Sequence, residues 1–324
     1  MKAVVYRTYG PPDVLRLEEV EAPKPKDHEI LVRVRAAEVT KSDCELRSFR
    51  FPVWWFWIPL RLALGVFRPR RSILGGYFSG EVTAVGASVS TFSPGQRVYG
   101  CLQLRFGAYA EYVCVPDRYT VAPMPRNLTF EQAAAVPLGG LNALHFMRCA
   151  EIRAGERVLV NGAGGSIGAY AIQLAKEMGA EVTAVDAAHK EQAIRRLGAD
   201  RFIDYETEDF AAGGEKYDVI FNMVAGRSFT SCIAALDRGG RYLMANAKLS
   251  DLLRSVFLRR SSGKRAVVAL APEAPEELAE LTDLLERGSL TAPVDRVYPM
   301  AEAPEAHRRV EAEQRLGPVI LKID

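Results

Sequence analysis

The chain has 324 residues, of which 48% are hydrophobic, and its 42 Lys and Arg against 40 Asp and Glu give a formal net charge of +2. This is the composition of an ordinary soluble globular protein. It argues against a disordered chain, a coiled coil or a generally basic nucleic-acid-binding protein. The length favours two domains. The longest apolar run, residues 51–60, contains two prolines and is shorter than the roughly 20 residues that a membrane-spanning helix needs.

The amino terminus and the cysteines bear on location and on metal binding. Residues 1–7 are too short, and too soon interrupted by polar side chains, for the apolar region of a signal peptide, so we expect a cytoplasmic protein. The five Cys and four His are scattered along the chain, and no two Cys form a CxxC pair. The sequence therefore indicates neither a disulfide framework nor a compact cysteine zinc site.

The first part of the chain, to about residue 120, is predicted to be rich in β-strand. Alternating apolar residues at 30–35 and 109–115 predict half-buried strands, and a Pro-Gly turn at 94–95 introduces another strand. Prolines at 123 and 125 predict an extended linker over residues 121–125.

After this linker the pattern changes to strands alternating with helices. Short apolar runs predict strands at residues 157–161, 181–186, 218–222, 240–245 and 265–270, and helical spacing predicts helices at 167–178 and 190–197. This alternation indicates an α/β fold with a doubly wound parallel sheet. Leucines between 278 and 285 predict a further helix that ends at Gly288. A last strand at 319–323 is expected to pair back onto the first domain.

A glycine-rich turn lies between the first of these strands and the helix that follows it. Its glycines allow a tight turn and close approach to a pyrophosphate, and the amino end of the helix offers free N–H groups and the positive end of its dipole. A position inside a βαβ unit is the context that a dinucleotide site requires. The alternative is a tight turn without a ligand. The candidate cofactor-binding residues are Gly162, Ala163, Gly164, Gly165, Ser166, Ile167 and Gly168.

Two charged residues after the second parallel strand bear on the choice of nicotinamide cofactor. Asp186 ends the strand, where a carboxylate can accept hydrogen bonds from the adenosine ribose and so favours NAD(H). Lys190 can instead pair with the 2′-phosphate of NADP(H), although a solvated lysine at the start of a helix is an equally good interpretation. The sequence leaves both cofactors open.

Together with six other segments, this turn resembles one known family. In order and spacing the segments are similar to the zinc-free, quinone oxidoreductase-like branch of the medium-chain dehydrogenase/reductases, and the similarity covers essentially the whole chain. The resemblance implies a GroES-like, β-rich catalytic domain made from residues 1–122 and 272–324, a Rossmann dinucleotide-binding domain at residues 123–271, and a nicotinamide cleft between them. The six segments are residues 36–43, 74–82, 106–112, 136–140, 197–200 and 203–205.

The positions at which zinc-dependent relatives hold their catalytic metal carry different residues here. By resemblance these positions are Thr40, Gly76 and approximately Ala135, where the relatives have Cys, His and Cys. None of the three is a zinc ligand of the required type. Tyr77 also replaces the acidic residue that follows the family histidine. The resemblance therefore implies a site without zinc, and a zinc rebuilt from other side chains is the disfavoured alternative.

The resemblance also implies the remaining site residues. Thr40, Asp43 and Tyr77 are the candidate catalytic residues. Asp43 either orients a water or hydroxyl or bonds to a loop backbone, and Tyr77 either donates to a substrate oxygen or packs in the core. The candidate cofactor contacts outside the glycine-rich turn are Lys41, Asn142, Asp186, Lys190, Tyr205, Val224, Ala225, Ala245, Asn246 and Ala247.

A site without a metal Lewis acid favours particular substrates. Developing negative charge must then be stabilised by hydrogen bonds, and a conjugated carbonyl disperses part of that charge itself. We therefore expect an NAD(P)H-dependent reductase that transfers hydride to a quinone, an enone or a related conjugated carbonyl. Two alternatives stay open: a zinc-free alcohol dehydrogenase or ketone reductase, and a non-catalytic dinucleotide-binding adaptor or membrane-associated protein.

One segment departs from the average composition. Residues 47–71 contain all three Trp and six Arg, with no acidic residue and no Lys. Because motif order places this segment beside the cleft, we expect Trp54, Trp57 and Tyr77 to line a pocket for a bulky apolar or aromatic substrate. A folded-over core or self-association surface is weighted equally, and contact with a membrane surface is not favoured. The resemblance implies a homodimer, for which the strand at 265–270 is the candidate interface, and the composition argues against a nucleic-acid partner.

Overall fold

The computed structural model describes residues 1–51, 57–245, 250–251, 254–255, 263–269 and 271–323. The chain forms two compact units: Met1–Leu138 with Glu273–Asp324, and Gly139–Pro272. The first boundary lies later than the predicted division after residue 122. The reason is that helix α3 (Phe130–Ala134) packs against the first unit, where Ala134 and Ala135 are buried with Ala36 and Ile320. The second boundary follows Pro272, next to the predicted division after residue 271.

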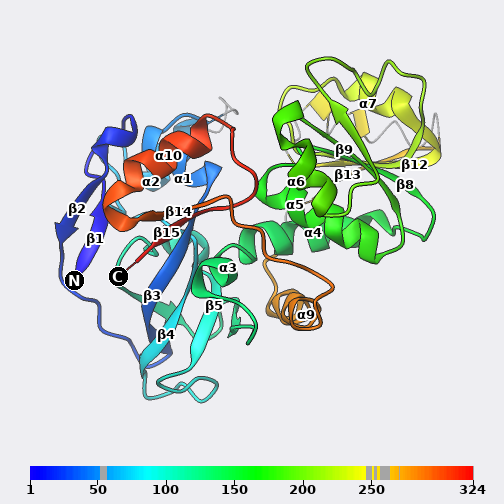
Figure 1. Cartoon of the computed structure of the whole chain (residues 1–324). Coiled ribbons are helices and arrows are strands. Elements are labelled where there is room, and N and C mark those ends of the chain that lie inside the picture. Colours follow the sequence, from blue (N-terminus) through cyan, green and yellow to red (C-terminus); the bar gives the residue numbers. More distant parts are fainter. Residues whose placement is uncertain (52–56, 246–249, 252–253, 256–262, 270, 324) are drawn as a thin grey trace. The chain divides into compact units, whose positions relative to one another are not determined.

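The first unit contains a mostly antiparallel sheet with the strand order β14-β15-β3-β4-β5-β7, and β6 also pairs with β3 (Figure 1). A separate two-stranded sheet joins β1 to β2. The strands are β1 (Lys2–Val5), β2 (Arg16–Glu19), β3 (Glu29–Val39), β4 (Tyr77–Val85), β5 (Arg97–Cys101), β6 (Tyr112–Pro116), β7 (Val121–Pro123), β14 (Arg296–Pro299) and β15 (Val319–Lys322).

The strand predictions for this unit are confirmed, but the predicted linker at residues 121–125 is wrong, because Val121–Pro123 forms β7 and pairs with β5. From Ile30 to Ala36 alternate residues of β3 are buried, as the apolar pattern requires for a half-buried strand, and the strand is fully buried from there to Val39. The Pro-Gly turn precedes β5, and its Gly95 has a φ of +86°. The last strand, β15, pairs antiparallel with β3, so the two ends of the chain share one sheet as expected.

Helices complete the first unit. Its helices are α1 (Lys41–Ser48), α2 (Trp57–Leu64), α3, α9 (Pro275–Glu286) and α10 (Ala303–Glu311), and single 3-10 turns occur at Pro12–Val14, Gln103–Arg105 and Met300–Glu302. Helix α9 confirms the predicted leucine helix, because its leucines form the buried face and Gly288 follows its end with a φ of +76°. Among the described residues, no helix is both long enough and apolar enough to cross a membrane.

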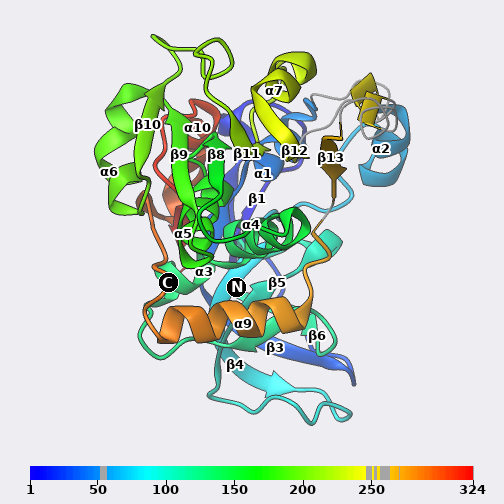
Figure 2. The ribbon, with the colours of Figure 1, turned by 90° about the vertical axis from the view of Figure 1, so that its right-hand side faces the viewer.

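The second unit is a parallel sheet with the strand order β10-β9-β8-β11-β12-β13, which Figure 2 shows from one side to the other. Its strands are β8 (Arg157–Asn161), β9 (Glu181–Asp186), β10 (Arg201–Asp204), β11 (Tyr217–Asn222), β12 (Leu236–Met244) and β13 (Arg265–Val268), and its helices are α4 (Pro137–Ala150), α5 (Ser166–Glu177), α6 (Glu191–Arg196) and α7 (Phe229–Ala235), with a 3-10 turn at Ala188–Lys190. The predicted doubly wound sheet is confirmed. Strand β10 was not predicted, because its charged end residues leave only two apolar positions.

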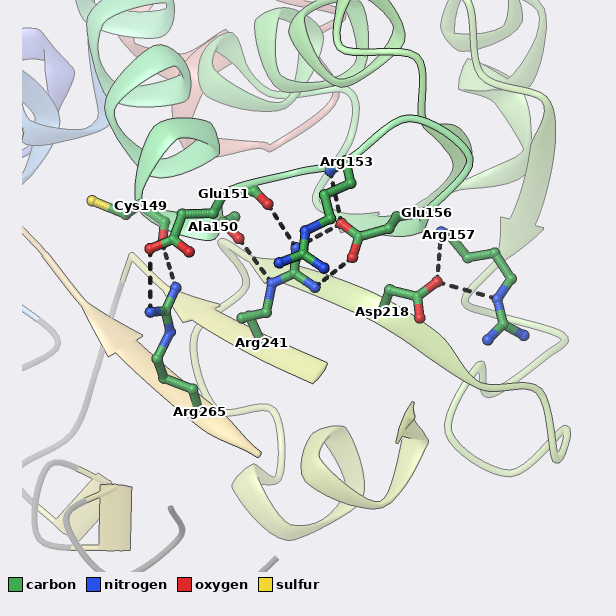
Figure 3. Close-up of polar contacts among 9 residues, drawn as sticks. All are labelled: Cys149, Ala150, Glu151, Arg153, Glu156, Arg157, Asp218, Arg241 and Arg265. Atoms are coloured by element: carbon green, nitrogen blue, oxygen red, sulfur yellow. Dashed lines mark hydrogen bonds and ion pairs between the residues drawn. The ribbon is translucent and has the colours of Figure 1, made fainter. Parts of the chain in front are cut away.

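Arginines tie the sheet of the second unit to the carboxyl end of α4 (Figure 3). Arg241 on β12 donates to the carbonyl of Ala150 (2.8 Å) and to both carboxylate oxygens of Glu156 (2.8 and 2.6 Å). Arg265 on β13 donates to the carbonyl of Cys149 (2.9 Å). The bonds from Arg241 lower the pKa of Glu156. Arg265 begins β13 and Arg241 lies beside it in register, so these contacts lie away from the carboxyl ends of the strands, where parallel sheets bind ligands.

Candidate active site

The glycine-rich turn follows β8 at the carboxyl edge of the parallel sheet. Gly162 has a φ of +92°, and a Cβ on Gly168 would lie 2.3 Å from the carbonyl oxygen of Gly162, so both positions require glycine. Helix α5 begins at Ser166, and its N-cap residue, Gly165, has no side chain that could cap the helix. No side chain of the N-cap residue therefore covers the amino end of α5, which is the kind of position at which helices bind anions. The turn fits the pyrophosphate of a dinucleotide.

Asp186 and Lys190 meet beside this turn. Asp186 Oδ2 accepts a hydrogen bond from the Gly164 N–H (2.7 Å), and its Oδ1 accepts one from the Ala187 N–H (2.9 Å). The Lys190 ammonium lies 2.9 Å from the same Oδ1, and both side chains are 8% exposed. The carboxylate that favours NAD(H) and the cation that favours NADP(H) thus form one ion pair, and the solvated-lysine interpretation of Lys190 is wrong.

An asparagine pair that the sequence reasoning missed shapes the next loop of this edge. Asn161 Nδ2, at the end of β8, donates to Asn222 Oδ1 at the end of β11 (2.7 Å), and both side chains are buried. Asn222 Nδ2 in turn donates to the carbonyl oxygen of Val224 (3.1 Å) and to the Tyr242 hydroxyl (3.1 Å). The signal in the sequence was an asparagine at the carboxyl end of each of two apolar strands.

The other predicted cofactor contacts differ in exposure. Tyr205 is 58% exposed and Val224 is 45% exposed, and both follow strands of the parallel sheet at its carboxyl edge. Ala225 is exposed, while Asn142 on α4 and Ala245 are partly buried. Asn246 and Ala247 lie outside the described residues.

In the first unit, Thr40 and Asp43 cap helix α1. The Thr40 hydroxyl donates to Asp43 Oδ2 (2.7 Å) and accepts from the Asp43 N–H (3.0 Å), while Asp43 Oδ2 also accepts from the Thr40 N–H (2.9 Å). The Gly75 N–H donates to Asp43 Oδ1 (3.1 Å) and the Tyr109 hydroxyl donates to Oδ2 (3.2 Å). Burial raises the pKa of Asp43, and these four donors oppose that shift. The geometry favours the interpretation of Asp43 as a loop-fixing residue.

Lys41, the residue after Thr40, makes an ion pair. Its ammonium lies 2.5 Å from Glu313 Oε1 and its side chain is 59% exposed. The structure therefore pairs Lys41 with an acidic residue of the first unit.

Tyr77 stands at the beginning of β4 and has an acidic partner. Its hydroxyl donates to Glu273 Oε1 over 2.7 Å, and Glu273 belongs to the segment that re-enters the first unit. Tyr77 is thus a hydrogen-bonded tyrosine with a titratable neighbour. Glu273 was not among the predicted site residues, because no motif in the sequence singles it out.

The residues at the three zinc-ligand positions do not fit a catalytic zinc. The Thr40 hydroxyl is committed to Asp43, Gly76 has no side chain, and Ala135 presents a fully buried methyl group. Within the described part of the chain, no three His, Cys, Asp or Glu side chains come together as a metal site would need.

The Trp- and Arg-rich segment is described in part. Trp54 lies outside the described residues, and Trp57 begins α2 with its side chain outside them. The guanidinium of Arg61 stacks 4.2 Å from the ring centres of both Tyr9 and Phe49, whereas Phe67 is 92% exposed. Some of this segment thus packs on the first unit and some faces solvent.

Comparison with known proteins places the chain in a family. An alcohol dehydrogenase GroES-like domain matches residues 26–126, and a family described as zinc-binding dehydrogenase matches residues 197–321. A quinone oxidoreductase from Pseudomonas aeruginosa is 31% identical in a match that covers 99% of both chains. This chain belongs to the quinone oxidoreductase-like family of medium-chain dehydrogenase/reductases. The predicted family and its GroES-like and Rossmann folds are therefore confirmed.

Two further relatives show the range of this family. The structure of the quinone oxidoreductase from Coxiella burnetii is similar with a TM-score of 0.88 and 29% identity, and the match covers 100% of this chain and 99% of that one. The spectinabilin polyketide synthase system protein NorB of Streptomyces orinoci is 35% identical over 272 residues. That match covers 80% of this chain and 12% of NorB, so the chain spans only a small part of this relative.

Proposed function

We propose that this protein is an NAD(P)H-dependent reductase that transfers hydride to a conjugated carbonyl, such as a quinone or an enone, without zinc. One observation carries the proposal. The glycine-rich turn is hydrogen-bonded to the Asp186–Lys190 ion pair, in a family member that has Thr, Gly and Ala at the three zinc-ligand positions. The name of the Pseudomonas aeruginosa relative, quinone oxidoreductase, supports this substrate class.

The described residues divide the work of binding the cofactor. The turn at residues 162–168 brings the pyrophosphate close to the backbone, and the amino end of α5 holds it through N–H groups and the positive end of the helix dipole. The exposed Tyr205 ring and the loop at Val224 and Ala225, both at the carboxyl edge of the sheet, contact the adenosine and the ribose, with Asn142 and Ala245 nearer the nicotinamide. When bound, the nicotinamide supplies the hydride.

The cofactor preference follows from the Asp186–Lys190 pair. The Lys190 ammonium offsets the charge of the Asp186 carboxylate at 2.9 Å, so the carboxylate repels a 2′-phosphate less than an unpaired one would. The same carboxylate still accepts hydrogen bonds from a ribose. The enzyme therefore uses both NADPH and NADH, and this pair sets the ratio of their kcat/KM values.

The substrate and setting complete the proposal. The three Trp of residues 54–57 favour a bulky apolar or aromatic substrate. The enzyme acts as a cytoplasmic homodimer and binds no nucleic acid.

The decisive experiment follows the oxidation of NADPH or NADH by absorbance with a quinone, an enone and a simple ketone as acceptors. The purified native protein is expected to reduce the quinone and the enone at least about tenfold faster than the ketone, because conjugation spreads the developing charge. Metal analysis of the same sample is expected to find no stoichiometric zinc. Fast ketone reduction with bound zinc would contradict the mechanism, and cofactor binding without any turnover would favour the adaptor function.

A further inference from the structure

Tyr77 and Glu273 form an acid pair that joins two distant parts of the chain. They are 196 positions apart in the sequence, and the Tyr77 hydroxyl and Glu273 Oε1 lie 2.7 Å apart within the first unit. Tyr77 directly follows Gly76, which stands at the family position of the zinc-ligating histidine. Both residues are partly buried.

The backbone of Glu273 is held in a strained conformation. Its φ is +49°, which places a residue other than glycine in the left-handed region. The Thr120 hydroxyl donates a short hydrogen bond to its carbonyl oxygen, so the backbone is fixed independently of the carboxyl group. Such strain is retained where the surrounding structure fixes a residue, and it is often found at functional sites.

The surroundings of the pair favour protonated groups. Burial raises the pKa of Glu273, and the hydrogen bond from Tyr77 opposes this. Burial and the charge of Glu273 raise the pKa of Tyr77 well above its ordinary value, and Glu38 on β3 and Cys101 on β5 are the other titratable groups that act on it. A raised pKa makes the tyrosinate strongly basic, so a tyrosine that gives its proton to a substrate readily takes one back from a neighbouring acid.

We propose that Glu273 and Tyr77 form a proton relay for the reduction, in which Tyr77 is the proton donor to the substrate and Glu273 is the positioning residue that reprotonates it. The inference rests on the proposed function. Protonated Glu273 donates to the Tyr77 oxygen and leaves the Tyr77 O–H free for a substrate oxygen. Ionised Glu273 accepts that O–H instead and withholds it.

The proton and electron counts balance. The substrate gains a hydride from the reduced cofactor, which is thereby oxidised, and gains a proton from the Tyr77 O–H as that bond breaks. The carboxylic acid of Glu273 then transfers its proton to the Tyr77 oxygen. Solvent returns a proton to Glu273, and the pair is ready for the next turnover.

Two variants of the full-length enzyme separate this relay from a purely structural anchor. Tyr77→Phe removes the donor, whereas Glu273→Gln keeps an oxygen that accepts the Tyr77 hydrogen bond but cannot release a proton. Tyr99→Phe is the matched control, because Tyr99 on the neighbouring strand β5 also anchors a distant segment, through a 2.8 Å hydrogen bond to Thr282 on α9. Thermal unfolding of each variant reports on the fold.

The relay predicts a specific kinetic pattern with an enone and saturating cofactor. Tyr77→Phe lowers kcat by about 100-fold and Glu273→Gln by about tenfold, with little change in KM, whereas Tyr99→Phe keeps the native kcat. The native kcat declines as the pH rises through the pKa of Glu273, and Glu273→Gln abolishes this decline. A native kcat and pH profile in Glu273→Gln would overturn the relay alone. Absence of turnover by the native enzyme with every acceptor would overturn the proposed function and the relay with it.

Discussion

Two side chains of opposite charge, Asp186 and Lys190, meet at the proposed cofactor site. Asp186 accepts the Gly164 N–H with one oxygen, and its other oxygen accepts the Ala187 N–H and faces Lys190, so the same carboxylate fixes the backbone and pairs with the cation. Asp43 differs, because all four donors to its carboxylate are neutral groups of the protein and the residue is only 1% exposed. Two acidic residues that look alike in the sequence thus serve different purposes.

Opposite substitutions in the Asp186–Lys190 pair are expected to shift cofactor preference in opposite directions. Asp186→Asn keeps an oxygen for the Gly164 N–H but removes the charge, so the ratio of kcat/KM for NADPH over NADH should rise about tenfold, equivalent to about 1.4 kcal/mol. Lys190→Met removes the cation and should lower the same ratio by a similar factor. Initial rates with both cofactors test this. A parallel shift in both variants would contradict the role of the pair.

At the scale of elements, the turn from β8 into α5 depends on close backbone packing. A Cβ on Gly168 would also lie 2.7 Å from the carbonyl oxygen of Ala163, and backbone atoms cannot move aside as a side chain can. The turn and the helix therefore keep their relative position only with glycine at this site.

Gly168→Ala is expected to lower the free energy of unfolding by about 1–3 kcal/mol and to weaken NADPH binding at least about tenfold. Gly213→Ala is the control in the same unit, because a Cβ there would meet its nearest neighbour, a Glu208 carboxylate oxygen, at an ordinary 3.8 Å. Urea unfolding and fluorescence titration with NADPH measure the two effects. Equal behaviour of the two variants would show that the turn tolerates a methyl group.

The contact between α1 and α10 has a pH-dependent component. His307 on α10 is fully buried with its Nδ1 3.3 Å from Cys44 Sγ on α1, and Figure 1 shows the two helices side by side. Burial, with a contribution from Arg47, lowers the pKa of His307 from 6.5 to about 3. Between these two values the unfolded chain binds a proton at this residue and the native protein does not, so stability falls as the pH falls.

The expected loss of stability from His307 is at most about 1.4 kcal/mol per pH unit below its ordinary pKa. His307→Gln should therefore show a smaller decrease in the free energy of unfolding between neutral pH and pH about 5 than the native protein. The control is His28→Gln, which replaces a side chain that is 73% exposed. It should keep the native dependence of the free energy of unfolding on pH. Denaturant titrations over this range provide the measurement, and a native slope in His307→Gln would refute the assignment.

At the scale of the whole molecule, each of the two large sheets has an edge strand on which a second copy of the chain could pair. β13 ends the parallel sheet and β14 ends the antiparallel one, among the strands that the structure describes. Each carries a valine that is 40% exposed, Val268 on β13 and Val297 on β14. An open strand edge is a surface on which a second copy can add its own strand.

The proposed homodimer forms through β13. Val268→Lys places a charge at this edge in both copies and should weaken the dimer at least about tenfold, because like charges then face each other across the interface. Val297→Lys makes the same change on β14 and should leave the dimer intact. Sedimentation equilibrium of both variants tests the assignment, which fails if the native protein is a monomer or if Val297→Lys dissociates it instead.

The sequence by itself determined the local elements and the family. Alternating burial along β3, the leucine face of α9 and the glycines at residues 162–168 are properties of neighbouring residues, and their periodicity and turn chemistry are therefore readable without a structure. The short strand β10 escaped because two apolar residues are too few to show a period.

The tertiary structure decided which side chains meet. Asp186 and Lys190 are close in the sequence, but only the structure shows that their ion pair is joined to the glycine-rich turn through the Gly164 N–H. Tyr77 and Glu273 are brought together by the return of the chain into the first unit, and Asp43 accepts the Tyr109 hydroxyl from 66 positions away. Local patterns fix strands and helices, whereas hydrogen bonds between distant residues depend on how the chain returns on itself, and no local pattern contains that information.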